Sequence, residues 1–383
     1  MRIGIVTFWQ SDDNYGQQLQ CWALQCYLKR LGHEPFLIRY LYKESVWRKW
    51  LKIMVKTAFI YPLLGWWRHR DIRRMEAVNR VKNEVRSFEE FRNKHIDQSR
   101  RIYGTLTELR QDPPAADVYI AGSDQIWNPM LLRRKDGRAF WLDFGEDRVR
   151  RVAYAASYGV DKSPPGLQKE LSRRLYRFDA LSVREESGVS ICRASGKEAT
   201  HVLDPTLLLS MDDYLSLLED IPVRPSPYIY IYSINISSKE DIRWSELRGF
   251  SKIGGLSLVV TPASGYLPGR ELFEGVEYSY AAIPEWLSLI RHAGLVVTTS
   301  FHGVVFCILF HKRFVYFPLS GTYAKGNSRV LNLLSNLSLS DCIWKAPGDF
   351  KRIYHLSIDW DRVEELLAPL RDKSVSFLKQ VLS

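Results

Sequence analysis

The 383-residue sequence lacks the spacings that mark metal and dinucleotide sites. Its five cysteines form no CxxC pair and have no histidine at zinc-binding spacing, which argues against a structural zinc site and for a reducing compartment. No GxGxxG motif follows a predicted strand, so the dinucleotide fingerprint is absent as well. We therefore expect neither a metal nor a bound cofactor.

Long apolar runs and a secretory leader are also missing. The N-terminus turns acidic after nine residues and has no small-residue cleavage site, which argues against a signal peptide. The most apolar stretch, Trp50 to Trp67, is interrupted by Lys52, Lys56, Pro62 and Gly65, so it is too broken to span a bilayer. We expect a cytoplasmic protein.

Positive charge is in excess and is unevenly distributed. The net charge is +11, which attracts anions such as phosphorylated substrates, acidic lipids or nucleic acid. Residues 44–101 hold 15 Lys or Arg against 7 Asp or Glu, beside Trp47, Trp50, Trp66 and Trp67. This pattern is typical of an element that contacts a membrane surface, although an amphipathic insertion packed on the N-terminal sheet explains it too. Because the excess is confined to one segment, we expect no nucleic-acid partner.

Strand and helix patterns alternate along the chain. Ile3 to Trp9 reads as a buried strand, a helical pattern follows from Leu19 to Leu31, and Pro35 to Tyr40 reads as a second strand. Such a βαβ unit specifies a parallel sheet. Further strands are predicted at 118–121, 152–156, 180–183 and 201–203, and then at 228–234, 256–261, 295–299 and 314–317.

The proline-rich stretch Ile221 to Tyr228 separates these two sets of strands and reads as a linker. We therefore predict an α/β protein with two Rossmann-like domains facing across a cleft. The N-terminal domain covers 1–220 with the basic insertion at 44–101, the C-terminal domain covers 221–350, and 351–383 forms a helical tail. Ligands of such sheets bind at the carboxyl ends of the strands.

Polar loops follow several of these strands. After the first strand, Asn14 and Gly16 permit a sharp turn into a helix whose free N–H groups suit an anion. In AGSDQIWNP, at 121–129, Ser123, Asp124 and Asn128 offer hydrogen bonds, although Asp124 could equally cap a helix. Trp127 of the same loop could stack on a sugar ring.

An arginine and a histidine stand out at two other strand ends. Arg184 follows an apolar strand in LSVREESG, where a guanidinium can clamp a carboxylate or phosphate unless Glu185 or Glu186 neutralises it. His302 lies between a buried strand and an apolar helix, at a helix N-terminus that disfavours imidazolium until an anion binds. Such a ring suits a switchable acid or base. Downstream, Arg329 could pair with the same anion.

The order of these motifs resembles that of the polysaccharide pyruvyl transferase family. The segments that carry the resemblance, over roughly Arg2 to Leu334, are NYGQQLQCWALQCYLKRLG, AGSDQIWNP, AYAASYG, SVREESG, VLDPTLLL, TTSFHGVVFCILF and GNSRVLNLL. The resemblance implies a GT-B-like fold, phosphoenolpyruvate as donor co-substrate, and a sugar of a surface polysaccharide or lipid-linked glycan as acceptor. The first loop, with Asn14, Tyr15 and Gly16, is less glycine-rich than in many relatives.

The resemblance also assigns His302 as the site histidine and Arg184 as the cleft arginine. We predict His302 and Arg184 as catalytic, and Ser300, Gly303, Asn327 and Arg329 as further donor-binding residues. Predicted to bind the acceptor are Asn14, Tyr15, Gly16, Ser123, Asp124, Trp127, Asn128, Ser157 and Tyr158. Two other functions stay open at this point: a GT-B-like glycosyltransferase that uses a nucleotide sugar, and a non-catalytic module that binds membrane or nucleic acid.

Overall fold

The computed structural model describes residues 1–42, 84–132, 134–164, 166–224, 227–263 and 271–383. Most of the basic segment, including the tryptophans on which the membrane interpretation depends, lies outside these residues. The part of that segment from residue 84 onward belongs to the N-terminal lobe, where it contributes one helix and one strand.

The N-terminal lobe is built on a seven-stranded parallel sheet in the order β3-β2-β1-β4-β5-β6-β7. Its strands are β1 (Arg2–Val6), β2 (Glu34–Tyr40), β3 (Gln98–Tyr103), β4 (Val118–Ala121), β5 (Arg150–Ala156), β6 (Ala180–Val183) and β7 (Thr200–His201). Its helices are α1 (Tyr15–Arg30), α4 (Phe88–His95), α5 (Leu106–Gln111), α6 (Pro129–Leu132), η1 (Asp136–Trp141), α7 (Gln168–Leu175) and α8 (Glu186–Ala194).

The C-terminal lobe is built on a five-stranded parallel sheet in the order β10-β9-β8-β11-β12. Its strands are β8 (Tyr228–Tyr232), β9 (Ser257–Val260), β10 (Glu277–Tyr278), β11 (Leu295–Thr298) and β12 (Phe314–Tyr316). The helices that follow β7 are η2 (Pro205–Leu208), α9 (Met211–Leu215), η3 (Lys239–Ile242), α10 (Trp244–Ile253), α11 (Ile283–His292), α12 (Phe301–Leu309), η4 (Gly321–Gly326), α13 (Ser328–Asn336), η5 (Ser340–Cys342), α14 (Asp349–Tyr354) and α15 (Trp360–Val381).

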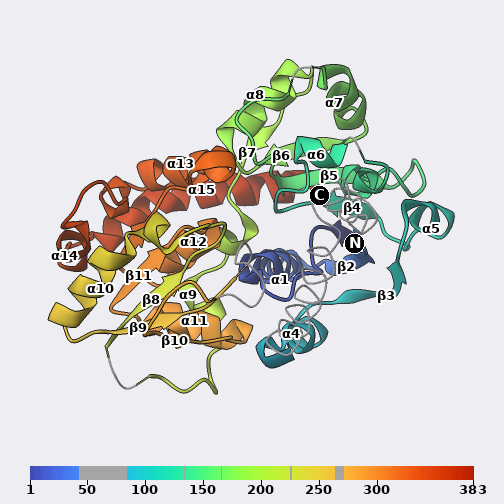
Figure 1. The fold of residues 1–383 in the computed structure, drawn as a ribbon. Coiled ribbons are helices and arrows are strands. Elements are labelled where there is room, and N and C mark those ends of the chain that lie inside the picture. Colours follow the sequence, from blue (N-terminus) through green and yellow to red (C-terminus); the bar gives the residue numbers. More distant parts are fainter. Residues whose placement is uncertain (43–83, 133, 165, 225–226, 264–270) are drawn as a thin grey trace, which may run out of the picture.

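The last helix joins the two lobes. Helix α15 starts in the C-terminal lobe and ends in the N-terminal lobe, where both termini of the chain lie (Figure 1). There Phe377 and Leu378 pack in one buried cluster with Ile3 and Ile5 of β1. The hydroxyl of Ser374 accepts a hydrogen bond from the Leu203 amide at 2.9 Å. The C-terminal segment therefore stabilises the N-terminal sheet.

The lobes also share a core next to the cleft. Tyr15, in the first turn of α1, stacks on Trp286 of α11 with ring centroids 4.9 Å apart, and its hydroxyl donates to the Ala281 carbonyl at 2.6 Å. Burial raises the pKa of Tyr15 far above its ordinary value, so the phenol stays protonated and keeps donating. This contact holds the start of α1 against the start of α11.

Among the described residues, no helix is both long and apolar enough to cross a membrane.

Candidate functional site

A buried carboxylate, Asp204, lies at the centre of the cleft. Asp204 follows β7 and is 1% exposed. Its Oδ1 caps η2, accepting from the amide and hydroxyl of Thr206 at 3.1 and 2.7 Å. Its Oδ2 accepts from Arg184 Nη1 at 2.5 Å and from the Ser123 hydroxyl at 3.0 Å. A buried carboxylate with this many donors is held in one orientation.

The charge of Asp204 is set by opposing effects. Burial alone would raise the pKa of this carboxyl, because desolvation disfavours the anion. The nearby His302 and Arg184 and the hydrogen bond from Thr206 outweigh burial and hold the pKa of Asp204 well below its ordinary value. The carboxylate is therefore ionised throughout the physiological range.

Arg184 emerges at the end of β6, as the sequence predicts, and its side chain is 2% exposed. Asp204, and not Glu185 or Glu186, pairs with the guanidinium. The buried Glu185 carboxylate instead accepts from Ser157, Tyr158 and Gly159. The Arg184 guanidinium also lies 4.7 Å from the centroid of the Phe301 ring, and its Nε has no hydrogen-bond partner.

His302 lies in the first turn of α12 and approaches the N-terminal lobe. Its Nε2 is 3.7 Å from Asp204 Oδ2 and is buried without a hydrogen-bond partner. The other side of the ring rests against Gly16, where a Cβ atom would lie 1.9 Å from Nδ1. Glycine at position 16 therefore makes the space for the imidazole. The sequence predicts that a bound anionic substrate lies near this ring. In the structure, the carboxylate of Asp204 is an anion at that place.

A second guanidinium, that of Arg329, faces the same region from α13. Once the Gln125 amide is oriented with its oxygen toward Arg329, that oxygen accepts from both terminal nitrogens at 2.7 and 2.8 Å. Burial, followed by repulsion from Arg184, lowers the pKa of Arg329 to about 10. The Arg329 guanidinium carbon lies 5.6 Å from the centroid of the Phe301 ring. Two arginines thus flank one phenylalanine, and the partner of Arg329 is neutral.

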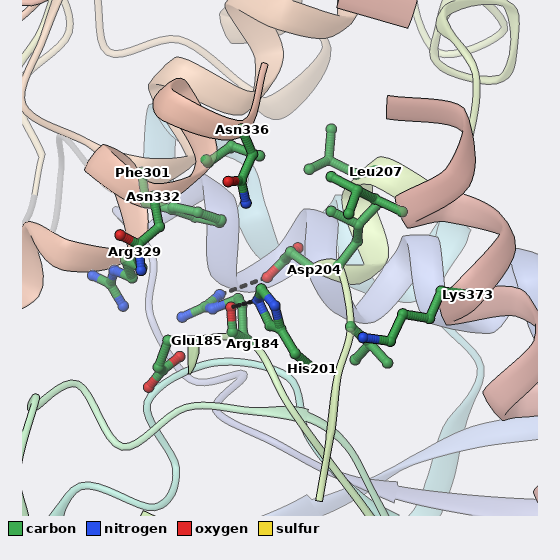
Figure 2. Close-up of a pocket in the computed structure, with 14 residues that line it drawn as sticks. Arg184, Glu185, His201, Asp204, Leu207, Phe301, Arg329, Asn332, Asn336 and Lys373 are labelled. Carbon is green, nitrogen blue, oxygen red and sulfur yellow. Dashed lines mark hydrogen bonds and ion pairs between the residues drawn. The ribbon is translucent and has the colours of Figure 1, made fainter. Parts of the chain in front are cut away.

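A small cavity of about 50 Å³ between the lobes is lined by Arg184, Asp204, Phe301 and Arg329. Figure 2 shows Asp204 and Arg184 pointing toward one another, with Arg329 and Phe301 reaching in from the C-terminal lobe. Lys373 of α15 and His201 of β7 line another part of the wall. Three lysine or arginine side chains against Asp204 and Glu185 leave the cavity with an excess of positive charge. Within the described part of the chain, no cluster of residues could hold a metal ion.

Several residues predicted to bind the acceptor are buried and already bonded within the protein. Trp127 is 0% exposed, stacks on Trp141 with centroids 4.6 Å apart, and donates to the Phe140 carbonyl, so it cannot stack on a sugar. Tyr15 is part of the interlobe core described above. The side chains of Ser123, Ser157 and Tyr158 are fully buried and bond to Asp204, Glu185 and Cys192 respectively. These assignments are therefore corrected to structural roles.

Other predicted residues shape the loops. The side chains of Asn14 and Ser300 cap α1 and α12. Gly303 permits close packing, since a Cβ there would lie 2.3 Å from the Thr298 hydroxyl. The Asn327 amide oxygen accepts from the Tyr316 hydroxyl and the Leu319 amide, and its nitrogen donates to the Leu319 carbonyl.

The two remaining polar residues of the AGSDQIWNP loop accept hydrogen bonds from nearby backbone amides. Asp124 accepts from Gln125 and has a left-handed backbone, and Asn128 accepts from Met130. Asp124 does not cap a helix, because the next helix, α6, begins only at Pro129.

Asp204, Gln125 and Phe301 are the site residues that the sequence prediction misses. The sequence contains a signal for Asp204, because the Asp-Pro pair in VLDPTLLL follows a predicted strand at its carboxyl end. Gln125 and Phe301 each adjoin a predicted site residue but carry no charge that would single them out.

Comparison with solved structures identifies the fold class. A UDP-GlcNAc 2-epimerase from Methanocaldococcus jannaschii, solved with UDP-GlcNAc and UDP, matches with a TM-score of 0.52 at 12% identity over 100% of this chain and 99% of that one. A UDP-GlcNAc 2-epimerase from Neisseria meningitidis matches with a TM-score of 0.46 at 7% identity over 98% and 94% of the two chains. The two parallel sheets facing across a cleft are the GT-B arrangement.

Comparison with protein families identifies the chain. No curated protein matches it significantly. The family model for polysaccharide pyruvyl transferase matches residues 14–321, which is most of the chain and includes Gly16, Arg184, Asp204 and His302. This protein is therefore a transferase that belongs to the polysaccharide pyruvyl transferase family.

Proposed function

We propose that the protein transfers a pyruvyl group from phosphoenolpyruvate to a sugar of a surface polysaccharide or its lipid-linked precursor, forming a cyclic pyruvate ketal without a metal or cofactor. The observation that carries this proposal is the convergence of Arg184, Arg329 and His302, from both lobes, around Asp204. Two guanidinium groups suit a donor that carries a carboxylate and a phosphate.

Donor binding depends on the two arginines in different ways. One nitrogen of Arg184 is held by Asp204, which fixes the direction of the guanidinium and leaves its remaining donors for an anion. Arg329 is held by the neutral Gln125 amide, so its charge is uncompensated by that contact. An anionic donor group replaces this neutral acceptor and gains a charge-assisted hydrogen bond.

His302 is the acid and base of the proposed reaction. Its protonated ring gives a proton to the methylene carbon of the donor, and a sugar hydroxyl oxygen bonds to the adjacent carbon. The hydroxyl proton returns to His302. A second hydroxyl oxygen of the same sugar then attacks that carbon, the carbon–phosphate oxygen bond breaks, and phosphate leaves with the second hydroxyl proton. Asp204, at 3.7 Å, stabilises the ring while it carries the positive charge.

The test is mass spectrometry of glycan acceptors incubated with the enzyme and phosphoenolpyruvate, with a nucleotide sugar as the competing donor. We expect the pyruvyl mass on the acceptor and thermal stabilisation by phosphoenolpyruvate only. His302→Ala should keep the fold and lose ketal formation by at least about 100-fold, because general acid–base help is typically 10²–10⁴-fold. His355→Ala, at an exposed position, is the control. Stabilisation by the nucleotide sugar alone would replace this proposal with a glycosyltransferase.

A lipid-linked acceptor would be met at the inner face of the membrane. The basic, tryptophan-rich composition of 44–101 supports contact with anionic headgroups. Replacing Trp66 and Trp67 with serine should reduce sedimentation of the protein with phosphatidylglycerol vesicles. An unchanged pellet would count against membrane contact and leave the proposed reaction intact.

A further inference from the structure

A second and larger cavity lies at the carboxyl ends of β8, β11 and β12. It encloses about 460 Å³ and is lined by residues of the C-terminal lobe alone. This volume falls within the roughly 300–1,000 Å³ typical of small-molecule pockets. From the adjacent strands β8 and β11 the sheet continues in opposite directions, through β9 on one side and β12 on the other. Such a switch point opens a crevice in which ligands of parallel sheets bind.

The cavity is connected to the His302 segment along the chain, through Thr299 and Ser300. The Thr299 hydroxyl lines the cavity, accepts from the Ile234 amide and donates to the Ile234 carbonyl, both at 2.8 Å. These bonds hold the loop after β8 against the loop after β11. The next residue, Ser300, caps α12, whose first turn carries His302. A ligand in the cavity therefore contacts the segment that positions the imidazole.

One wall of the cavity is aromatic. The rings of Phe317 and Trp344 stack with centroids 5.5 Å apart and an interplanar angle of 22°. The guanidinium of Arg243 lies 4.7 Å from the centroid of the Trp344 ring. No carboxylate among the described residues pairs with Arg243. Aromatic and guanidinium surfaces of this kind pack against the apolar faces of sugar rings and still offer hydrogen bonds.

The polar groups around this wall indicate a neutral ligand. Asn235 and Glu240 line the cavity, and within the described part of the chain their side chains have no hydrogen-bond partner. Glu240 and Asp241 supply two carboxylates against the single guanidinium of Arg243. The negative balance opposes phosphoenolpyruvate or a diphosphate, in contrast to the positive site around Arg184. An amide, a carboxylate and a guanidinium together match hydroxyl groups, which both donate and accept.

We propose that this cavity is the acceptor subsite, which binds a neutral sugar unit of the glycan next to the unit that receives the ketal. This inference rests on the proposed function and deepens it, because it separates the acceptor site from the donor site. It replaces the buried N-terminal residues to which the sequence assigns acceptor binding.

The experiment measures KM for the acceptor that the parent enzyme pyruvylates, and KM for phosphoenolpyruvate, in two variants. Asn235→Gly removes the amide and tolerates the left-handed backbone at this position, where φ is 56°. Glu240→Gln keeps the shape and removes the charge. Each should raise acceptor KM about three- to ten-fold, the effect of losing one hydrogen bond, and leave donor KM unchanged. Glu219→Gln, at an exposed position outside the cavity, is the matched control.

The outcomes separate this inference from the proposed function. If the parent forms no ketal with phosphoenolpyruvate, the proposed function fails. If the parent is active and both variants keep its acceptor KM, the subsite alone is overturned. The subsite is also overturned if UDP-glucose binds the parent and these substitutions weaken that binding without changing acceptor KM. Unfolding temperatures near that of the parent show that the KM change does not come from loss of structure.

Discussion

Replacing Asp204 with asparagine tests the centre of the site most directly. The substitution keeps the shape and the contacts to Thr206 but leaves the buried Arg184 guanidinium without the carboxylate that pairs with it. Breaking a buried ion pair in this way costs about 3–5 kcal/mol. A 383-residue chain that unfolds as one unit has an unfolding entropy of about 0.8 kcal/mol/K, so we expect the melting temperature to fall by about 4–6 °C. The core shared by the lobes supports unfolding as one unit.

Differential scanning calorimetry of the parent and the variant measures this fall. The control is Asp112→Asn, which removes one member of an exposed ion pair and should lower the free energy of unfolding by less than about 1 kcal/mol. Adding Arg184→Met to Asp204→Asn should restore part of the stability, because the uncompensated charge is gone, without restoring donor binding. A single variant that melts within about 1 °C of the parent would refute the buried-pair reasoning.

The pKa of Asp204 also determines how the stability difference between the parent and Asp204→Asn depends on pH. The pKa of Asp204 in the folded protein lies well below its value of about 3.9 in the unfolded chain. Its stabilisation is therefore fully present above about pH 4 and is lost as the pH falls toward the folded-state pKa. The gap between parent and Asp204→Asn should be constant from about pH 5 to 8 and should narrow below about pH 4.

Three further predictions concern single positions. Gly16→Ala should displace the His302 ring and lower kcat by about 100-fold, while Gly249→Ala, whose new Cβ would contact nothing within 4 Å, should leave kcat unchanged. Arg329→Gln should weaken phosphoenolpyruvate binding in isothermal titration calorimetry by about ten-fold or more, because it removes one of the two guanidinium groups that face the cavity. Trp127→Phe should lower stability by about 1–3 kcal/mol in urea unfolding and leave acceptor KM unchanged, and a raised acceptor KM would contradict its structural role.

The alternation of strands and helices could be predicted because it depends on local patterns. The buried strands β1, β4, β8 and β11 are short apolar runs that the sequence displays directly. The edge strands β3 and β10 were not predicted. In β3 only Ser99 and Tyr103 are buried among charged neighbours, and β10 has two residues. Neither of these two edge strands has an apolar run, so periodicity does not identify them.

The candidate site was predictable in part for the same reason. The positions of Arg184 and His302 at strand ends follow from the runs that precede them. Which side chain meets which does not follow, because Asp204 reaches Ser123 across 81 positions of the chain and Arg184 across 20. Trp127 was wrongly predicted to contact a ligand, because its position after a strand favours such a contact. The packing of Trp141 against its ring, which the sequence does not reveal, buries it instead.

The position of Asp204 connects the fold to the chemistry. The carboxylate follows β7 of the N-terminal lobe, and the imidazole of His302 belongs to α12 of the C-terminal lobe. Their separation of 3.7 Å therefore exists only while the lobes are held together by α15 and by the Tyr15–Trp286 stack. Gly16, next to Tyr15, receives the ring of His302 at the same junction. Because the contacts that join the lobes adjoin those that orient the acid–base residue, a change that loosens the interlobe core should reduce turnover before it unfolds either sheet.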